Sequence, residues 1–105
     1  MKLTIQDKKI LASWGERPDD IAQIERASKS NILELKLEDL ETGKKRKIGQ
    51  KEAIRILGRE TFLSGLSRAA FHWSSSRESE DDKFSVSFIG ENYLRRNKDV
   101  KRFNY

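Results

Sequence analysis

The side chains best suited to chemistry in this chain are cations that follow one another closely. They are the run Lys44, Lys45, Arg46 and Lys47 and, at helical spacing after it, Lys51, Arg55 and Arg59. A stripe of this kind can contact successive phosphates, and arginine adds bidentate hydrogen bonds to phosphate oxygens. The pattern therefore predicts a surface that binds a phosphate backbone. The alternative is a lysine-rich hairpin turn followed by an ordinary solvated helix face.

A second set of cations lies near the C-terminus and includes Arg95 and Arg96. Tyr93, Phe103 and Tyr105 are interleaved with these cations. Cations that follow phosphates and rings that stack on bases are typical of single-strand binding. A disordered basic terminus has the same composition, and so has a segment that becomes ordered on a protein partner.

Catalytic and metal-binding patterns are weak. His72 is the only histidine, and although Ser74–Ser76 follow it, a catalytic triad also needs a rigid orienting acid. The acidic residues of Glu78–Asp82 lack the spacing of a calcium loop, and Gly43 and Lys44 lack the flanking residues of a phosphate-binding loop. The chain has no cysteine, which excludes thiolate chemistry. We therefore expect no enzyme activity, no cofactor and no metal ion.

The charge is distributed unevenly over the 105 residues. Residues 1–43 contain seven Lys and Arg against nine Asp and Glu, whereas residues 44–105 contain fifteen against eight. This asymmetry favours a face that meets a polyanion, DNA or RNA, or an acidic protein partner. A basic charge that only maintains solubility is the alternative.

The segment Met1–Trp14 mixes charged residues with apolar ones and has no continuous apolar stretch like that of a signal peptide. No window of the sequence approaches the length that crosses a bilayer. We therefore expect a cytoplasmic protein with no membrane partner.

Two helices come first among the elements that must position these side chains. Thr4 can cap a helix that runs through Trp14, with Asp7 placed as in a capping box. Pro18 is suited to open a second helix, because its missing N–H is one that a first turn leaves unpaired. Ser30 and Asn31 can close that helix.

A hairpin is predicted next. Leu33, Leu35 and Leu37 alternate with charged residues, which indicates a strand with one buried face. Gly43 can adopt the positive φ of a hairpin turn, and Lys45–Ile48 can return as the second strand.

Two further helices and a strand complete the pattern. A third helix is predicted over Gln50–Leu57, and a fourth carries apolar residues at intervals of three and four: Phe62, Leu63, Leu66, Ala69, Ala70 and Trp73. Gly65 inside this fourth helix suggests close packing against another element. Ser74–Lys83 has no apolar residue and is expected to be an exposed loop, whereas the alternation in Phe84–Phe88 predicts a third strand.

The predicted order is α-α-β-β-α-α-β. It indicates an α+β fold in which a small, mostly antiparallel sheet is packed by helices. We expect one domain over residues 1–105, with a basic tail from about residue 91 whose ordering the pattern leaves open.

The two adjacent helices within Lys51–Trp73 also suggest a helix-turn-helix motif. However, the would-be recognition helix is mostly apolar, and Arg68 and His72 are its strongest candidates for base contacts. A helix of this composition is better suited to a core than to a DNA groove.

The segment GRETFLSGLSRAAFHWS (Gly58–Ser74), preceded by KEAIRILG, resembles small uncharacterised accessory proteins carried on bacterial phages and conjugative elements. The similarity extends back through ILELKLEDLETGK. The resemblance implies a bacterial mobile-element context and no catalytic residue. Our leading hypothesis is a non-enzymatic nucleic-acid-binding accessory protein, and the alternative is a protein-interaction module or an inhibitor of a host protein complex. DNA versus RNA, sequence preference and oligomeric state stay open.

Overall fold

The computed structural model describes residues 2–29, 34–72 and 74–90. These residues form α1 (Ile5–Ser13), α2 (Pro18–Lys29), β1 (Glu34–Asp39), β2 (Lys45–Ile48), α3 (Gln50–Leu57), α4 (Arg59–Phe71), β3 (Ser74–Glu78) and β4 (Phe84–Ile89). The strands pair antiparallel in the order β2-β1-β4-β3. The α+β class and the predicted order of elements are confirmed, and β3 is an additional strand.

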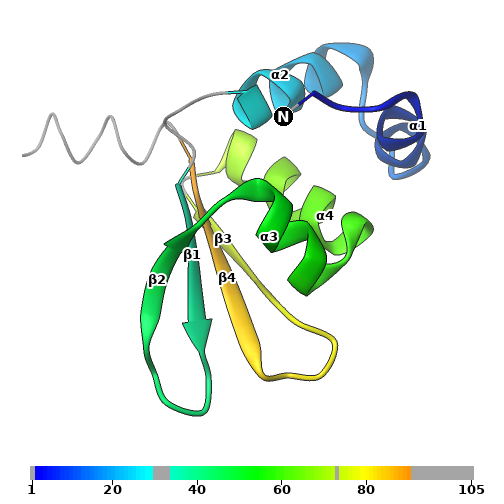
Figure 1. Ribbon diagram of the computed structural model, residues 1–105. Helices are drawn as coiled ribbons and strands as arrows, with labels where there is room; N and C mark the ends of the chain where they lie inside the picture. Colours follow the sequence, from blue (N-terminus) through cyan, green and yellow to red (C-terminus); the bar gives the residue numbers. More distant parts are fainter. Residues whose placement is uncertain (1, 30–33, 73, 91–105) are drawn as a thin grey trace, which may run out of the picture.

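The elements are arranged in layers. The helices α3 and α4 pack against one face of the sheet, and α1 and α2 pack on α4 (Figure 1). Strand alternation directs Leu35, Leu37, Val86 and Phe88 into the core, where all four side chains are buried. Lys36 lies on the opposite face of the sheet and is partly exposed.

Helix α4 is the central helix of the core, as its apolar periodicity predicted. Phe62, Leu63, Leu66 and Ala69 are each no more than 2% exposed. They belong to one cluster with the inward residues of the sheet and with residues of α1, α2 and α3. Trp73, which was expected to continue the stripe, lies outside the described residues.

Gly65 allows α4 to approach the sheet closely. A Cβ atom at this position would lie within 2.8 Å of three carbons of the Phe88 ring, a separation that real Cβ atoms essentially never show. The Phe88 ring in turn packs against Phe62, with the ring centroids 5.5 Å apart. The predicted close packing at Gly65 is therefore confirmed.

The expectation of a loop over Ser74–Lys83 is wrong for its first half, because β3 occupies Ser74–Glu78. The strand has no apolar residue, and polar contacts replace apolar packing against α4. The Ser75 hydroxyl donates to the Gly65 carbonyl over 2.8 Å, and Arg77 Nε donates to Ser64 Oγ over 2.9 Å. These bonds satisfy side chains that the alternation of the strand turns toward the helices.

The N-terminal helices begin as predicted. The Thr4 hydroxyl accepts from the Asp7 amide and the Asp7 carboxylate accepts from the Thr4 amide, so the capping box is complete. Pro18 is the first residue of α2. The residues expected to close α2, Ser30 and Asn31, lie outside the described residues, as does the basic tail from residue 91.

Candidate nucleic-acid interface

The β1–β2 turn presents the first cation of the predicted site. Gly43 has a φ of 75°, as expected for this turn, and its amide donates to the Asp39 carbonyl over 2.7 Å. The Asp39 carboxylate accepts from the amides of Glu41 and Thr42. The turn is thus fixed by its own hydrogen bonds, and Lys44 is an exposed residue between the turn and β2.

The four consecutive cations do not form one surface. In β2, successive side chains alternate between the two faces of the sheet. Arg46 is paired with Leu37 across the strands and shares the helix-covered face with it. Lys45 and Lys47 lie on the opposite face, where Lys47 Nζ is 3.0 Å from the Glu34 carboxylate. The apolar Ile48, two residues after Arg46, is a signal in the sequence that could have predicted this division.

Arg46 is compensated by an acidic neighbour. Both of its terminal nitrogens donate to the two carboxylate oxygens of Glu52 on α3, one of them over 3.2 Å. Hydrogen bonding to Arg46 holds the pKa of Glu52 below its usual range. This pair joins β2 to α3, and it neutralises part of the Arg46 charge within the protein.

Helix α3 carries two further predicted cations. Lys51 and Arg55 are one turn apart and exposed, while Ala53 and Leu57 are buried on the opposite side of the helix. Within the described parts of the chain, neither cation takes part in an ion pair. The predicted basic helix face is therefore present over these two residues.

Arg59 does not continue that line of cations without an ion pair. Its Nε and Nη2 atoms lie 2.5 and 2.6 Å from the two carboxylate oxygens of Asp7, which is fully buried. This pair joins the start of α4 to α1, and hydrogen bonding to Arg59 lowers the pKa of Asp7. Arg95 and Arg96, the remaining predicted contacts, lie outside the described residues.

A region made of β2, the residue before it and the exposed side of α3 carries most of the predicted cations, although Lys45 and Lys47 lie on the sheet face opposite α3. We call it the basic edge and define it as Lys44, Lys45, Lys47, Lys51 and Arg55. Among these side chains, Lys47 alone forms an ion pair with another described residue. In the described sheet β2 is an outer strand, and α3 follows it in the chain and is joined to it through Arg46 and Glu52. The body of α3 packs over β1 and β4 (Figure 1).

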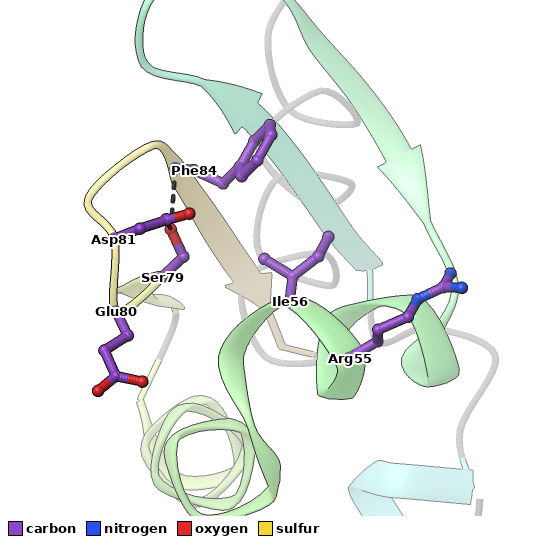
Figure 2. A pocket seen from close by; sticks show the side chains of 6 residues that line it. All are labelled: Arg55, Ile56, Ser79, Glu80, Asp81 and Phe84. Carbon is purple, nitrogen blue, oxygen red and sulfur yellow. Dashed lines mark hydrogen bonds between the residues drawn. The ribbon is translucent and has the colours of Figure 1, made fainter.

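A groove lies beside the basic edge, on the helix-covered side of the two hairpin tips. One pocket of about 460 Å³ is lined by Arg55, Ile56, Ser79, Glu80, Asp81 and Phe84 (Figure 2). A neighbouring pocket of about 350 Å³ is lined by Leu37, Asp39, Lys44, Lys45, Arg46 and Phe84. Phe84 lines both pockets, so the groove has an apolar middle, cations toward β2 and carboxylates toward the β3–β4 turn.

The sequence did not predict this groove. It depends on the β1–β2 and β3–β4 turns lying next to each other, which a hydrogen bond from the Leu40 amide to the Lys83 carbonyl secures over 3.0 Å. The two turns are far apart in the sequence, and no local pattern brings them together.

The helix-turn-helix hypothesis requires α4 to enter a DNA groove. The structure instead packs α4 against the strands on one side and against α1 and α2 on the other. Its side chains Phe62, Leu63 and Leu66 are buried, and Arg68 and His72 are exposed. This helix is therefore a core element, as its apolar composition indicated.

Comparison of the chain with protein-family models, curated proteins and solved structures found no match. Within the described ranges, no helix combines the length and hydropathy needed to cross a membrane. The same residues contain no cluster of three or more His, Cys, Asp or Glu side chains suited to a metal ion.

Proposed function

We propose that this chain is a non-enzymatic nucleic-acid-binding accessory protein, of the kind carried by bacterial mobile elements, and that the basic edge contacts phosphates. The observation that carries the proposal is the charge of Lys44, Lys45, Lys51 and Arg55, which no ion pair within the described residues compensates. Exposed cations along one edge are suited to a phosphate backbone, because its counterions are released when the phosphates are neutralised.

Edge protection is the competing explanation for the lysines of β2. Lysines on an outer strand prevent two sheets from pairing edge to edge. That role accounts for Lys45 and Lys47, but Lys51 and Arg55 lie on a helix, where no strand can add. The continuation of positive charge from β2 onto α3 therefore favours an anionic ligand.

The test is the affinity for labelled duplex and single-stranded DNA, measured by fluorescence anisotropy over a range of salt concentrations. In the variant with Lys44, Lys45, Lys51 and Arg55 replaced by alanine, we expect weaker binding and a shallower salt dependence. Each lost phosphate contact makes the negative slope of log K against log salt shallower by about 0.9. Binding that depends on four such contacts weakens on the order of 100-fold when the salt concentration rises from about 50 to about 200 mM.

A matched control removes the same number of charges from the opposite end of the chain. Lys2, Lys9, Arg17 and Arg26 are exposed and take part in no ion pair with another described residue. If their replacement by alanine weakens binding as much as the basic-edge variant does, the affinity reflects net charge alone and the proposed site is wrong.

A protein partner is the second candidate function, and the groove with its apolar middle is the observation that favours it. Phe84 and Ile56 offer apolar contact, while Arg55 and Glu80 provide charges of opposite sign within the same pocket. An extended peptide with both kinds of charge would fit these features. A phosphate backbone would instead be repelled by the carboxylates of Glu80 and Asp81.

Glu80→Lys separates the two candidates. Because an exposed charge is worth up to about 1 kcal/mol, we expect this substitution to leave DNA affinity unchanged or to raise it by less than about fivefold. A protein held in the groove would be captured from a nuclease-treated bacterial lysate by the unmodified chain and lost with Glu80→Lys. That result, together with DNA binding only at low salt, would replace the nucleic-acid proposal.

A further inference from the structure

A second pocket lies at the opposite edge of the sheet from β2, where α4 meets β3 and the α1–α2 turn. It has a volume of about 280 Å³, and Trp14, Phe71, Arg68, His72, Arg77 and Glu16 are among its lining residues. None of these residues belongs to the basic edge. The pocket therefore needs an explanation of its own.

Two aromatic rings are left open to solvent here. Trp14 is 46% exposed and Phe71 is 37% exposed, and they are the two aromatic members of the set of large apolar side chains that the described residues expose. The sequence pattern predicted a first helix that runs through Trp14, yet Trp14 follows that helix as its C-cap residue. Exposed rings that line one pocket provide flat surfaces on which another ring can stack.

The same pocket has an excess of positive charge. Arg77 is held in place by bonds from Nε to Ser64 Oγ and from Nη1 to the Ser76 carbonyl, over 2.9 and 2.8 Å. These partners are neutral, so the charge of Arg77 is not cancelled by them. Arg68 is exposed and forms no ion pair with another described residue, whereas the carboxylate of Glu16 accepts a hydrogen bond from Ser67.

Rings and cations together select a planar ligand that carries an anionic group. The volume of about 280 Å³ falls just below the range of about 300–1,000 Å³ found for drug-sized ligands, so the pocket suits one ring system with the remainder of the ligand outside. A nucleotide within a strand meets these requirements, because its base is flat and its phosphate can accept bidentate hydrogen bonds from arginine. In a duplex the base is enclosed by its neighbours and cannot reach the rings.

We propose that this pocket binds one unpaired base of single-stranded nucleic acid, with the base on Trp14 and Phe71 and the adjoining phosphate on Arg68. The charge of Arg77 would keep the pocket positive. The inference rests on the proposed function, because both assume that the protein binds nucleic acid. It concerns a different surface and a different form of the nucleic acid.

The test compares a labelled oligodeoxythymidylate of about 12 nucleotides with a labelled duplex, by fluorescence anisotropy. For Trp14→Ala we expect single-strand affinity to fall by about 5- to 150-fold, which is the range for loss of one stacked base, with duplex affinity unchanged. Trp14→Phe should retain most of the affinity because it keeps a ring. Ile5→Ala, at an apolar side chain that is 77% exposed, is the matched control and should have no effect.

Arg68→Glu provides a second variant at an exposed position, in case Trp14→Ala disturbs the end of α1. It should weaken single-strand binding selectively, and circular dichroism melting should show that the fold is kept. Quenching of tryptophan fluorescence by the oligonucleotide should be smaller in Trp14→Phe, although Trp73 remains in both proteins.

The outcomes separate the two proposals. Single-strand affinity that is unchanged in Trp14→Ala and Arg68→Glu overturns the pocket and leaves the basic edge standing. Affinity that depends on Trp14 but not on Lys44, Lys45, Lys51 and Arg55 overturns the basic edge alone, and absence of binding to both nucleic acids overturns both. Adenosine monophosphate that competes as well as the oligonucleotide would identify a free nucleotide as the ligand and overturn the single-strand assignment.

Discussion

Replacement of Arg59 by alanine is expected to lower the free energy of unfolding by about 3 kcal/mol. The reason is the carboxylate of Asp7, which is 0% exposed and accepts from Arg59 Nε and Nη2. Without the guanidinium, a buried carboxylate keeps only Thr4 as a described hydrogen-bonding partner. The value lies at the lower end of the range for breaking a buried pair, because Arg59 itself is 41% exposed and part of its charge is screened by water.

The loss should also depend on pH in a defined direction. Hydrogen bonding to Arg59 lowers the pKa of Asp7 below the ordinary value of an aspartate side chain. A carboxyl group whose pKa is lower in the folded than in the unfolded protein adds stability above the unfolded pKa, and this stability is lost as the pH falls through the folded pKa. The difference between the unmodified protein and Arg59→Ala should therefore be full at neutral pH and shrink below about pH 4.

Urea denaturation at neutral and acidic pH measures both effects. Arg26→Ala is the matched control, because Arg26 is exposed and forms no ion pair with another described residue. It should change the free energy of unfolding by less than about 0.5 kcal/mol. An Arg59→Ala protein as stable as this control at neutral pH would show that the pair with Asp7 contributes little. Arg59 would then regain its place as a candidate phosphate contact.

The pair of Asp7 and Arg59 also shows where reasoning from the sequence ends. Its members are 52 residues apart. Local spacing placed Asp7 correctly in the capping box of α1. The same kind of local reasoning assigned Arg59 to the predicted phosphate contacts. The contact between them depends on how α1 packs on α4, which no local pattern contains.

Elements with a strong local period were predictable. The bounds of α3 agree with the prediction over Gln50–Leu57, and the alternation in β1 and β4 gave the buried face of each strand. The strand β3 was not predictable, because Ser75 and Arg77 take the inward positions that apolar residues normally fill. The segment forms a strand because it pairs with β4 and makes polar contacts with α4. Both are tertiary interactions.

The candidate site was predictable in part for the same reason. Lys51 and Arg55 could be placed on the outer side of α3 because the helical period is local. Arg46 was grouped with its neighbours, although the alternation of β2 turns it toward Glu52. The pocket at Trp14 and Phe71 joins side chains from two distant segments, so only the fold could bring them together.

Leu66→Ala is expected to cost about 2–5 kcal/mol, since a large buried side chain is lost and the cavity left behind collapses only in part. Leu66 is 0% exposed and belongs to α4, the helix that packs against the strands and against α1 and α2 at the same time. Small domains have a total stability of about 5–15 kcal/mol, so this one substitution removes a large fraction of it.

Urea denaturation followed by circular dichroism gives the value, and Leu40→Ala provides the matched control. Leu40 is 41% exposed in the β1–β2 turn, and the same chemical change there should cost less than about 1 kcal/mol. Equal effects at the two leucines would mean that α4 is not the centre of the core. The placement of Trp14, Phe71 and Arg68 around one pocket would then lose its structural basis, because α4 carries two of these three side chains.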